Sequence, residues 1–295
     1  MTKHKIDVYT LIKSETHKLR NVGIGTANLD CRLLLTKSLK LNKTLHNHQN
    51  VNISNDDFKN FKNLVGQRLS GKPVSRIINK KNFWDNEFEL NEDTLDPRPD
   101  SETLIDAVLS HFKSKTQILK ILDLGSGTGC LGLSLLKEYP YSEASFLDVS
   151  KKSLKIVKIN SFNFGFSDRS KFVNLDWRDE NWVANLVKIE NKTKFDVIIS
   201  NPPYIPTEDI KNLQKEVKEY DPFIALNGGE DGLQAYHLII PKLKNIMNKN
   251  GKIFFEIGKG QENCITKLAA VHGLFPQEYR KDFSGIIRVI TFIVK

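Results

Sequence analysis

Hydrophobic residues recur with two different periods along the chain. In the first 80 residues, apolar side chains return every three or four positions, which is typical of helices with one buried face; the segments are 8–19, 29–35 and 58–69. Thr26 and Ser54 precede the second and third segments as helix caps. The pattern therefore predicts a small helical domain over residues 1–80.

The pattern changes after residue 80. Apolar residues alternate with polar ones on both sides of Asp85-Asn86, which predicts a β-hairpin within a linker over residues 81–97. From residue 98 to 295, short β-rich runs alternate with helical patterns. Strands are expected near 118–124, 144–148, 171–175, 195–200, 251–257, 273–279 and 286–293. This order predicts a doubly wound α/β sheet whose ligand lies at the carboxyl ends of the strands.

A glycine-rich turn follows the first strand of that sheet. It consists of Gly125, Ser126, Gly127, Thr128 and Gly129, and an apolar helical segment continues from it. Glycines permit positive φ and close approach of a ligand to the backbone, and the following helix N-terminus supplies free N–H groups. The turn is therefore a candidate cofactor loop.

Two acidic residues narrow the choice of cofactor. Asp148 ends the second strand, 19 residues after Gly129, where a carboxylate can accept both hydroxyls of a ribose. Asp123 lies just before the glycines, where an acid suits a cationic ligand better than a pyrophosphate. S-adenosylmethionine is therefore favoured over a dinucleotide, and Trp177 is placed beside its adenine. The simpler alternatives are an ordinary strand-end acid for Asp148 and core packing for Trp177.

The segment Asn201-Pro202-Pro203-Tyr204 follows the apolar run 195–200 directly. Two prolines remove two backbone donors and hold an extended path, so the Asn201 carboxamide and the neighbouring carbonyl become fixed acceptors. Tyr204 adds an aromatic face for a planar group. The pattern indicates a clamp for a planar NH2 group, either an amide or the exocyclic amine of adenine. A proline-rich turn after a buried strand is the structural alternative.

Together these motifs resemble the release-factor glutamine methyltransferases, the HemK/PrmC family. The segment 96–102, Asp-Pro-Arg-Pro-Asp-Ser-Glu, is similar to the family's Ile-Pro-Arg-Pro-Glu-Thr-Glu, and residues 28–35 are similar to its leucine-rich N-terminal helix. The resemblance covers essentially the whole chain. Asp96 and Asn79-Lys80 depart from the family pattern, which makes the packing of the linker less certain.

The resemblance implies a class I S-adenosylmethionine-dependent methyltransferase with a seven-stranded sheet. The expected reaction methylates N5 of the glutamine in the Gly-Gly-Gln motif of class I peptide chain release factors and yields S-adenosylhomocysteine. The catalytic residues would be Asn201, Pro202 and Tyr204, with Pro203 and Arg98 also touching the substrate and Asn201 also touching the cofactor. Arg98 could equally form a structural salt bridge, and the role of Glu256 stays open. Alternative functions are methylation of a ribosomal-protein glutamine, methylation of an adenine amine, and a non-catalytic binding module.

Charge separates the two parts of the chain. The net charge is +9, and residues 1–85 carry 16 Lys or Arg against 6 Asp or Glu, so the whole excess lies there. A basic domain beside a neutral one favours docking to an acidic surface. The alternative is a lysine-rich solvated face that reflects only genomic composition. We expect release factors as partners, no stable nucleic-acid partner, and a monomer.

Composition excludes several other classes. No apolar run approaches the roughly 20 residues of a membrane span, and the N-terminal residues lack the apolar core of a signal peptide. The three cysteines are far apart and lack metal-site spacing, and His46-Asn47-His48 has no accompanying ligand cluster. A cytoplasmic enzyme without a metal is the expectation.

Overall fold

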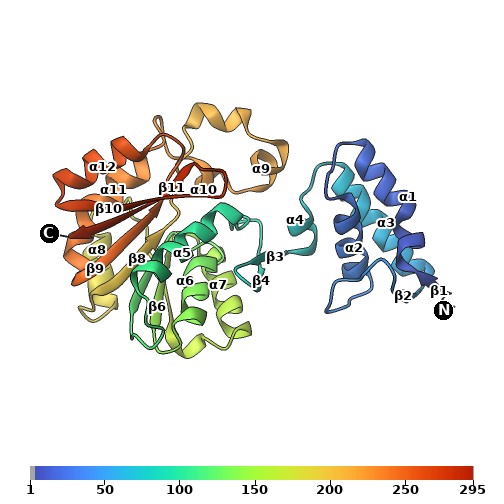
Figure 1. Ribbon diagram of the computed structural model, residues 1–295, viewed down its shortest axis with the longest axis horizontal. Helices are drawn as coiled ribbons and strands as arrows, with labels where there is room; N and C mark the ends of the chain where they lie inside the picture. The colour runs from blue at the N-terminus through green and yellow to red at the C-terminus, as the bar shows by residue number, and fades with distance from the viewer. Residues whose placement is uncertain (1–3, 295) are drawn as a thin grey trace. The chain divides into compact units, whose positions relative to one another are not determined.

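The computed structural model describes residues 4–294 and divides into two compact units (Figure 1). The N-terminal unit contains Met1–Lys80 together with a later segment, Gln214–Tyr220. The catalytic unit contains Lys81–Leu213 and Asp221–Lys295. From the sequence we expected residues 214–220 to belong to the catalytic domain and the hairpin to form a separate linker.

The N-terminal unit is mainly helical. Its helices are α1 (Val8–Asn21), α2 (Ala27–Ser38), α3 (Asn55–Leu69), α4 (Val74–Ile78) and α9 (Lys215–Tyr220). The predicted cap at Ser54 is a full capping box, because Ser54 and Asp57 each accept from the other's backbone N–H. Thr26 stands at the start of α2 but makes no capping hydrogen bond through its side chain.

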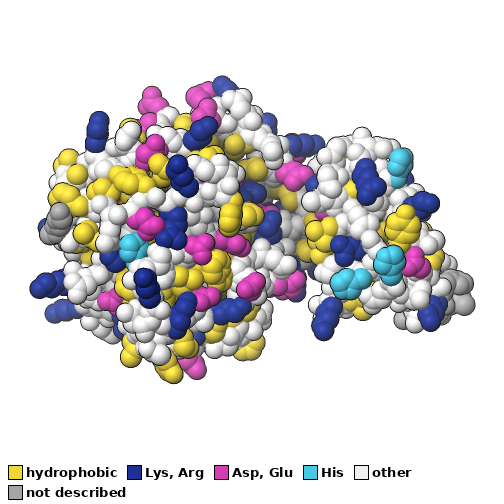
Figure 2. Space-filling model, in the orientation of Figure 1, with side chains coloured by type: hydrophobic (Ala, Val, Ile, Leu, Met, Phe, Trp, Pro, Cys, Tyr) yellow, Lys and Arg dark blue, Asp and Glu magenta, His cyan; other side chains and the backbone are white. Residues whose placement is uncertain are grey.

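Two features of this unit were not predicted. Strands β1 (His4–Asp7) and β2 (Asn50–Ile53) form a short antiparallel pair beside the helices. Arg68 is buried on α3 and bonds Asp30 at 2.8 Å and Glu216 of α9 at 2.6 Å. Figure 2 shows basic side chains spread over the visible face of this unit, with hydrophobic side chains between them.

The hairpin consists of β3 (Lys80–Phe83) and β4 (Asn86–Glu89). Its two-residue turn is Trp84-Asp85, one position earlier than the sequence suggested, and both residues have positive φ, as a turn between twisted strands requires. Phe83 and Phe88 are buried in one core cluster with helix side chains of the catalytic unit. The indole N–H of Trp84 donates to Glu138 at 2.9 Å. The hairpin is thus packed as part of the catalytic unit.

Within residues 4–294, the large sheet has seven strands in the order β10-β11-β9-β8-β5-β6-β7. They are β5 (Lys120–Leu124), β6 (Glu143–Asp148), β7 (Ser170–Asn174), β8 (Phe195–Ser200), β9 (Met247–Glu256), β10 (Leu274–Lys281) and β11 (Ile287–Val294). Strands β5 to β9 pair in parallel. At one edge, β11 pairs antiparallel with β9, and β10 pairs antiparallel with β11. The predicted doubly wound sheet is confirmed.

Helices cover both faces of this sheet (Figure 1). One face packs against α5 (Glu102–His111), α6 (Cys130–Glu138) and α7 (Lys151–Asn163), and the other against α8 (Trp182–Ile189), α11 (Gln234–Leu243) and α12 (Glu262–Val271). The chain also forms a short helix, α10 (Phe223–Leu226), and 3-10 turns at Pro99–Ser101, Ser167–Arg169, Thr207–Asn212 and Lys244–Ile246.

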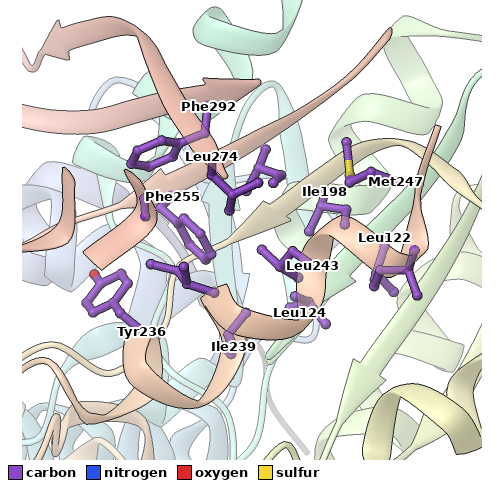
Figure 3. Packing of buried hydrophobic residues seen from close by; sticks show 14 of the residues in the cluster. Leu122, Leu124, Ile198, Tyr236, Ile239, Leu243, Met247, Phe255, Leu274 and Phe292 are labelled. Carbon is purple, nitrogen blue, oxygen red and sulfur yellow. The ribbon is translucent and has the colours of Figure 1, made fainter. Parts of the chain in front are cut away.

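Alternate residues of the central strands enter opposite cores. On β8, Val197 and Ile199 face one cluster and Ile198 faces the other, as expected for side chains with a period of two. Figure 3 shows Ile198 with Leu122, Leu243 and Phe255 in the cluster on the face covered by α8, α11 and α12. Because both faces are buried, these strands read as continuous apolar runs.

We expect Arg68→Ala to destabilise the N-terminal unit by about 3–5 kcal/mol, because Asp30 would remain buried without its cation. Hydrogen exchange of the full-length chain should show faster exchange in α2, α3 and α9. Glu219→Ala is the matched control, since it removes only an exposed pair with Lys215, worth at most about 1 kcal/mol. Equal effects of the two variants would contradict the assignment.

Candidate active site

A cavity of about 410 Å³ opens at the carboxyl ends of β5, β6 and β8. Its wall is formed by residues drawn from 93–101, 125–131, 148–153, 175–178, 201–203 and 223–238, all within the catalytic unit. This is the point where the strand order reverses, because β5 lies between β6 and β8. Ligands of doubly wound sheets bind at such switch points, and the volume lies within the range of ligand pockets.

The glycine-rich loop forms one side of the cavity. Gly125, Gly127 and Gly129 all have positive φ, and α6 begins directly after them. A Cβ at Gly125 would lie 2.9 Å from the Trp177 ring, and one at Gly129 would lie 2.7 Å from Val157. Only glycine therefore allows the loop to pack this closely, and Ser126 and Thr128 complete it as further wall residues.

Asp148 holds the loop from the end of β6. Its carboxylate accepts the N–H of Gly127 at 2.9 Å and the N–H of Ser150 at 2.8 Å. The same residue lines the cavity. Burial raises the pKa of Asp148, although the two backbone hydrogen bonds oppose that shift. The carboxylate retains lone pairs that can accept hydroxyl groups of a ligand.

Asp123 lies behind the loop and outside the cavity wall. It is fully buried, and one carboxylate oxygen accepts the N–H of Gly132 at 2.9 Å. The other oxygen has no hydrogen-bond partner among residues 4–294. Burial raises the pKa of Asp123 to about 7. Its expected contact with the cationic end of a cofactor stays a prediction.

Trp177 lines the cavity and lies against Gly125. It is partly buried and packs against the core cluster on the α11 face. The two interpretations of this residue are therefore compatible: one part of the ring supports the core, and another part faces the cavity.

The Asn201-Pro202-Pro203-Tyr204 turn divides its residues between the cavity and the core. Asn201 and Pro203 line the cavity, whereas Pro202 is buried and Tyr204 packs against the core cluster on the α11 face. The amino group of Asn201 donates to the Ser101 hydroxyl at 3.0 Å. Burial raises the pKa of Tyr204, whose hydroxyl donates to Glu256 at 3.2 Å. The roles assigned to all four residues stay predictions.

Arg98 lines the cavity and also forms a salt bridge with the buried Asp221. The geometry is thus consistent with both roles considered for Arg98, contact with the substrate and a structural salt bridge. The backbone N–H of Asp96, the residue that departs from the resembled segment, also donates to Asp221, at 3.3 Å. Asp221 therefore anchors the segment that carries Arg98.

Sequence reasoning missed Ser101 and left Glu256 open. Ser101 is nearly fully buried and accepts a hydrogen bond from Asn201. The only sequence signal for a role of Ser101 was its position close to Arg98. Glu256 ends β9, and a polar residue at the carboxyl end of a central strand was the available signal. Residues 4–294 contain no group of three or more His, Cys, Asp or Glu that could hold a metal ion. No helix in the same range is long and apolar enough to cross a membrane.

The chain matches two family descriptions. Residues 10–78 match the PrmC N-terminal domain, and residues 99–219 match the Methyltransferase small domain. A solved structure from Alicyclobacillus acidocaldarius, described as a protein-(glutamine-N5) methyltransferase (release factor-specific), is 22% identical. It covers 68% of this chain and 94% of its own, with a TM-score of 0.44.

Several curated relatives are similar over nearly the full chain. A Release factor glutamine methyltransferase of Bradyrhizobium diazoefficiens is 34% identical and covers 93% of this chain and 90% of its own. One of the same description from Agrobacterium fabrum is 33% identical, with 93% of each chain covered. A Bifunctional methyltransferase of Rickettsia felis is 32% identical over 96% of this chain, which spans only 57% of that longer protein.

Asp123→Asn should change how stability depends on pH. Because the pKa of Asp123 is raised from 3.8 to about 7, the folded protein binds a proton that the unfolded chain releases, so this residue's contribution to stability falls as pH rises between these values. From pH 5 to pH 8 the wild type should lose roughly 2–3 kcal/mol relative to the variant. Urea unfolding at each pH measures this difference. Asp106→Asn, on the exposed side of α5, is the control, and parallel curves for wild type and Asp123→Asn would contradict the assignment.

Proposed function

The chain belongs to the release factor glutamine methyltransferase family, and we propose that it transfers a methyl group to a glutamine side-chain amide of a release factor. The single observation that carries the proposal is the placement of Asn201 in the cavity wall with its amino group turned to Ser101. The carboxamide oxygen is then available to accept an N–H bond from a substrate amide.

The residues of the cavity fit S-adenosylmethionine as the methyl donor. Asp148 offers carboxylate lone pairs for ribose hydroxyls, and Trp177 offers an aromatic surface for the adenine. Asp148 lines the cavity, and Asp123 is buried on the strand that leads into the glycine-rich loop; negative charge at these positions favours a positively charged ligand. When bound, the cofactor supplies an activated methyl on its sulfonium and no metal is required.

The contribution of the chain is positioning. An amide nitrogen is a weak nucleophile because its lone pair is delocalised into the carbonyl. Acceptance of its two N–H bonds by the Asn201 side chain and the Pro202 carbonyl would localise electron density on the nitrogen and orient it. Tyr204 supports the turn from the core side, and the nitrogen loses its proton after methyl transfer.

The finer substrate assignment rests on the resemblance of the whole chain, including the Pro-Arg-Pro segment at 97–99. We place the target glutamine in the Gly-Gly-Gln motif of class I release factors. The basic N-terminal unit would dock to an acidic surface of the folded factor, because exposed Lys and Arg side chains dominate its charge.

Asp148→Ala should weaken binding of S-adenosylmethionine by roughly 1.5–3 kcal/mol, because two charge-assisted contacts to the ribose would be lost. Isothermal titration calorimetry with a chelator present measures this change and tests metal independence in the same experiment. Asp168→Ala, an exposed substitution in a 3-10 turn, is the control. Unchanged affinity in Asp148→Ala would show that the ribose assignment is wrong.

Asn201→Ala should abolish methyl transfer to the release factor and leave cofactor affinity nearly intact, because the lost acceptor acts on the nucleophile. Mass spectrometry of the Gly-Gly-Gln peptide, with labelled cofactor, measures the transfer. Asn163→Ala, at the exposed end of α7, is the matched control.

A substrate variant completes that experiment. Changing the target glutamine to glutamate should remove all labelling, since a carboxylate offers no N–H donor to the acceptors of the turn. Labelling that persists on the glutamate variant, or that appears on adenine in DNA or RNA instead, would overturn the glutamine proposal. Labelling of a ribosomal-protein glutamine alone would retain the chemistry and reject the release factor.

A further inference from the structure

The short helix α10 places two large apolar side chains at the open side of the cavity. Phe223 and Ile224 both line the cavity, and they are 57% and 50% exposed. Leu226, on the same helix, is buried. Large apolar side chains that form part of a cavity wall and still remain half exposed are typical of a binding surface rather than of core packing.

Backbone hydrogen bonds attach the end of α10 to the Asn201-Pro202-Pro203-Tyr204 turn. The N–H of Ile205, the residue after this turn, donates to the Leu226 carbonyl at 3.1 Å. The N–H of Gly228 donates in return to the Ile205 carbonyl at 2.8 Å. The helix is therefore fixed relative to the turn that is proposed to bind the target amide.

The start of α10 is held as well. Asp221, two residues before Phe223, forms the salt bridge with Arg98, which itself lines the cavity. Pro222 lies between them and has φ −66°, the value that its ring imposes. Because the backbone of α10 is fixed at both ends, a ligand that packs against its side chains orders little additional structure, so the contact costs less entropy.

The order of the strands divides the cavity wall into two halves. β5 lies between β6 and β8 in the sheet. Asp148 and Trp177, to which we assign the cofactor, end β6 and follow β7. Phe223 and Ile224 follow β8, as Asn201 does. The two apolar side chains therefore belong to the half of the wall that carries the proposed substrate residues.

The open side of the cavity suits a substrate that remains part of a larger chain. A free small molecule buries most of its surface in its pocket, whereas a glutamine side chain that enters from a protein leaves its backbone at the mouth. The backbone on either side of the glutamine then packs against the residues that form the mouth. An aromatic ring and a branched apolar side chain offer flat contact area to peptide planes and Cα atoms. A glycine-rich segment presents little else.

We propose that Phe223 and Ile224 are specificity-determining residues that contact the peptide backbone flanking the target glutamine of the release factor. This inference rests on the proposed function of the same cavity. It assigns α10 to the substrate and separates it from the residues that hold the cofactor.

Kinetics of variants test this assignment. Phe223→Ala and Ile224→Ala should each raise the KM for the intact release factor by about tenfold, because apolar area buried by the substrate is lost. The kcat and the Kd of S-adenosylmethionine should stay nearly unchanged, which a general loss of structure would not allow. Phe223→Leu retains apolar area and should keep most of the affinity. Phe162→Ala is the matched control, because Phe162 is 76% exposed on α7 and does not line the cavity.

Cross-linking measures the contact without methyl transfer. Phe223→benzoylphenylalanine, irradiated with the release factor and S-adenosylhomocysteine, should link to residues next to the target glutamine, as peptide mass spectrometry would show. Phe162→benzoylphenylalanine should link to none of them. Unchanged KM in both alanine variants, cross-links only to residues remote from the glutamine, or weakened cofactor binding in place of a raised KM would each overturn the inference. Failure of the proposed function is recognised separately, because the wild type itself would then methylate no glutamine of the release factor.

Discussion

The shared ending of three parallel strands is the constraint on which the site depends. Leu124 of β5 pairs with Leu147 of β6 on one side and Ser200 of β8 on the other, so the glycine-rich loop, Asp148 and Asn201 emerge at one level. The Ser200 hydroxyl donates to the Leu124 carbonyl at 2.7 Å and ties two of these ends together. A shift of one residue in this register would turn every side chain to the opposite face.

Three acids are buried at or near the carboxyl ends of strands in the large sheet. Asp123, Asp148 and Glu256 come from different strands, and burial is the largest cause of the raised pKa of each. Each would be more stable exposed to water, so the fold places negative charge where it is unfavourable in the absence of a cation. Such placement is typical of binding sites rather than of packing. The same burial lowers the stability of the folded chain near neutral pH, where these acids ionise.

Motifs and periodicity predicted the sheet, the glycine-rich loop and the helical N-terminal unit, because each depends on local sequence. The hairpin turn was misplaced by one residue because Trp84 adopts positive φ, which is rare for an aromatic residue. The β1–β2 pair and the Arg68 contacts were missed because they join residues far apart in sequence. Ser101 was missed for the same reason: its bond to Asn201 spans 100 residues. The sequence predicted a clamp at Asn201, but only the fold shows that its amino group bonds Ser101.

Because α9 belongs to the N-terminal unit, that unit is built from two separate stretches of the chain. Within residues 4–294 the chain passes between the units at 80/81, again at 213/214, and back at 220/221. Arg68 reaches its second carboxylate only through that later excursion. A gene segment for residues 1–80 therefore encodes an incomplete body, and a functional exchange of this unit between relatives would have to carry two separate pieces of coding sequence.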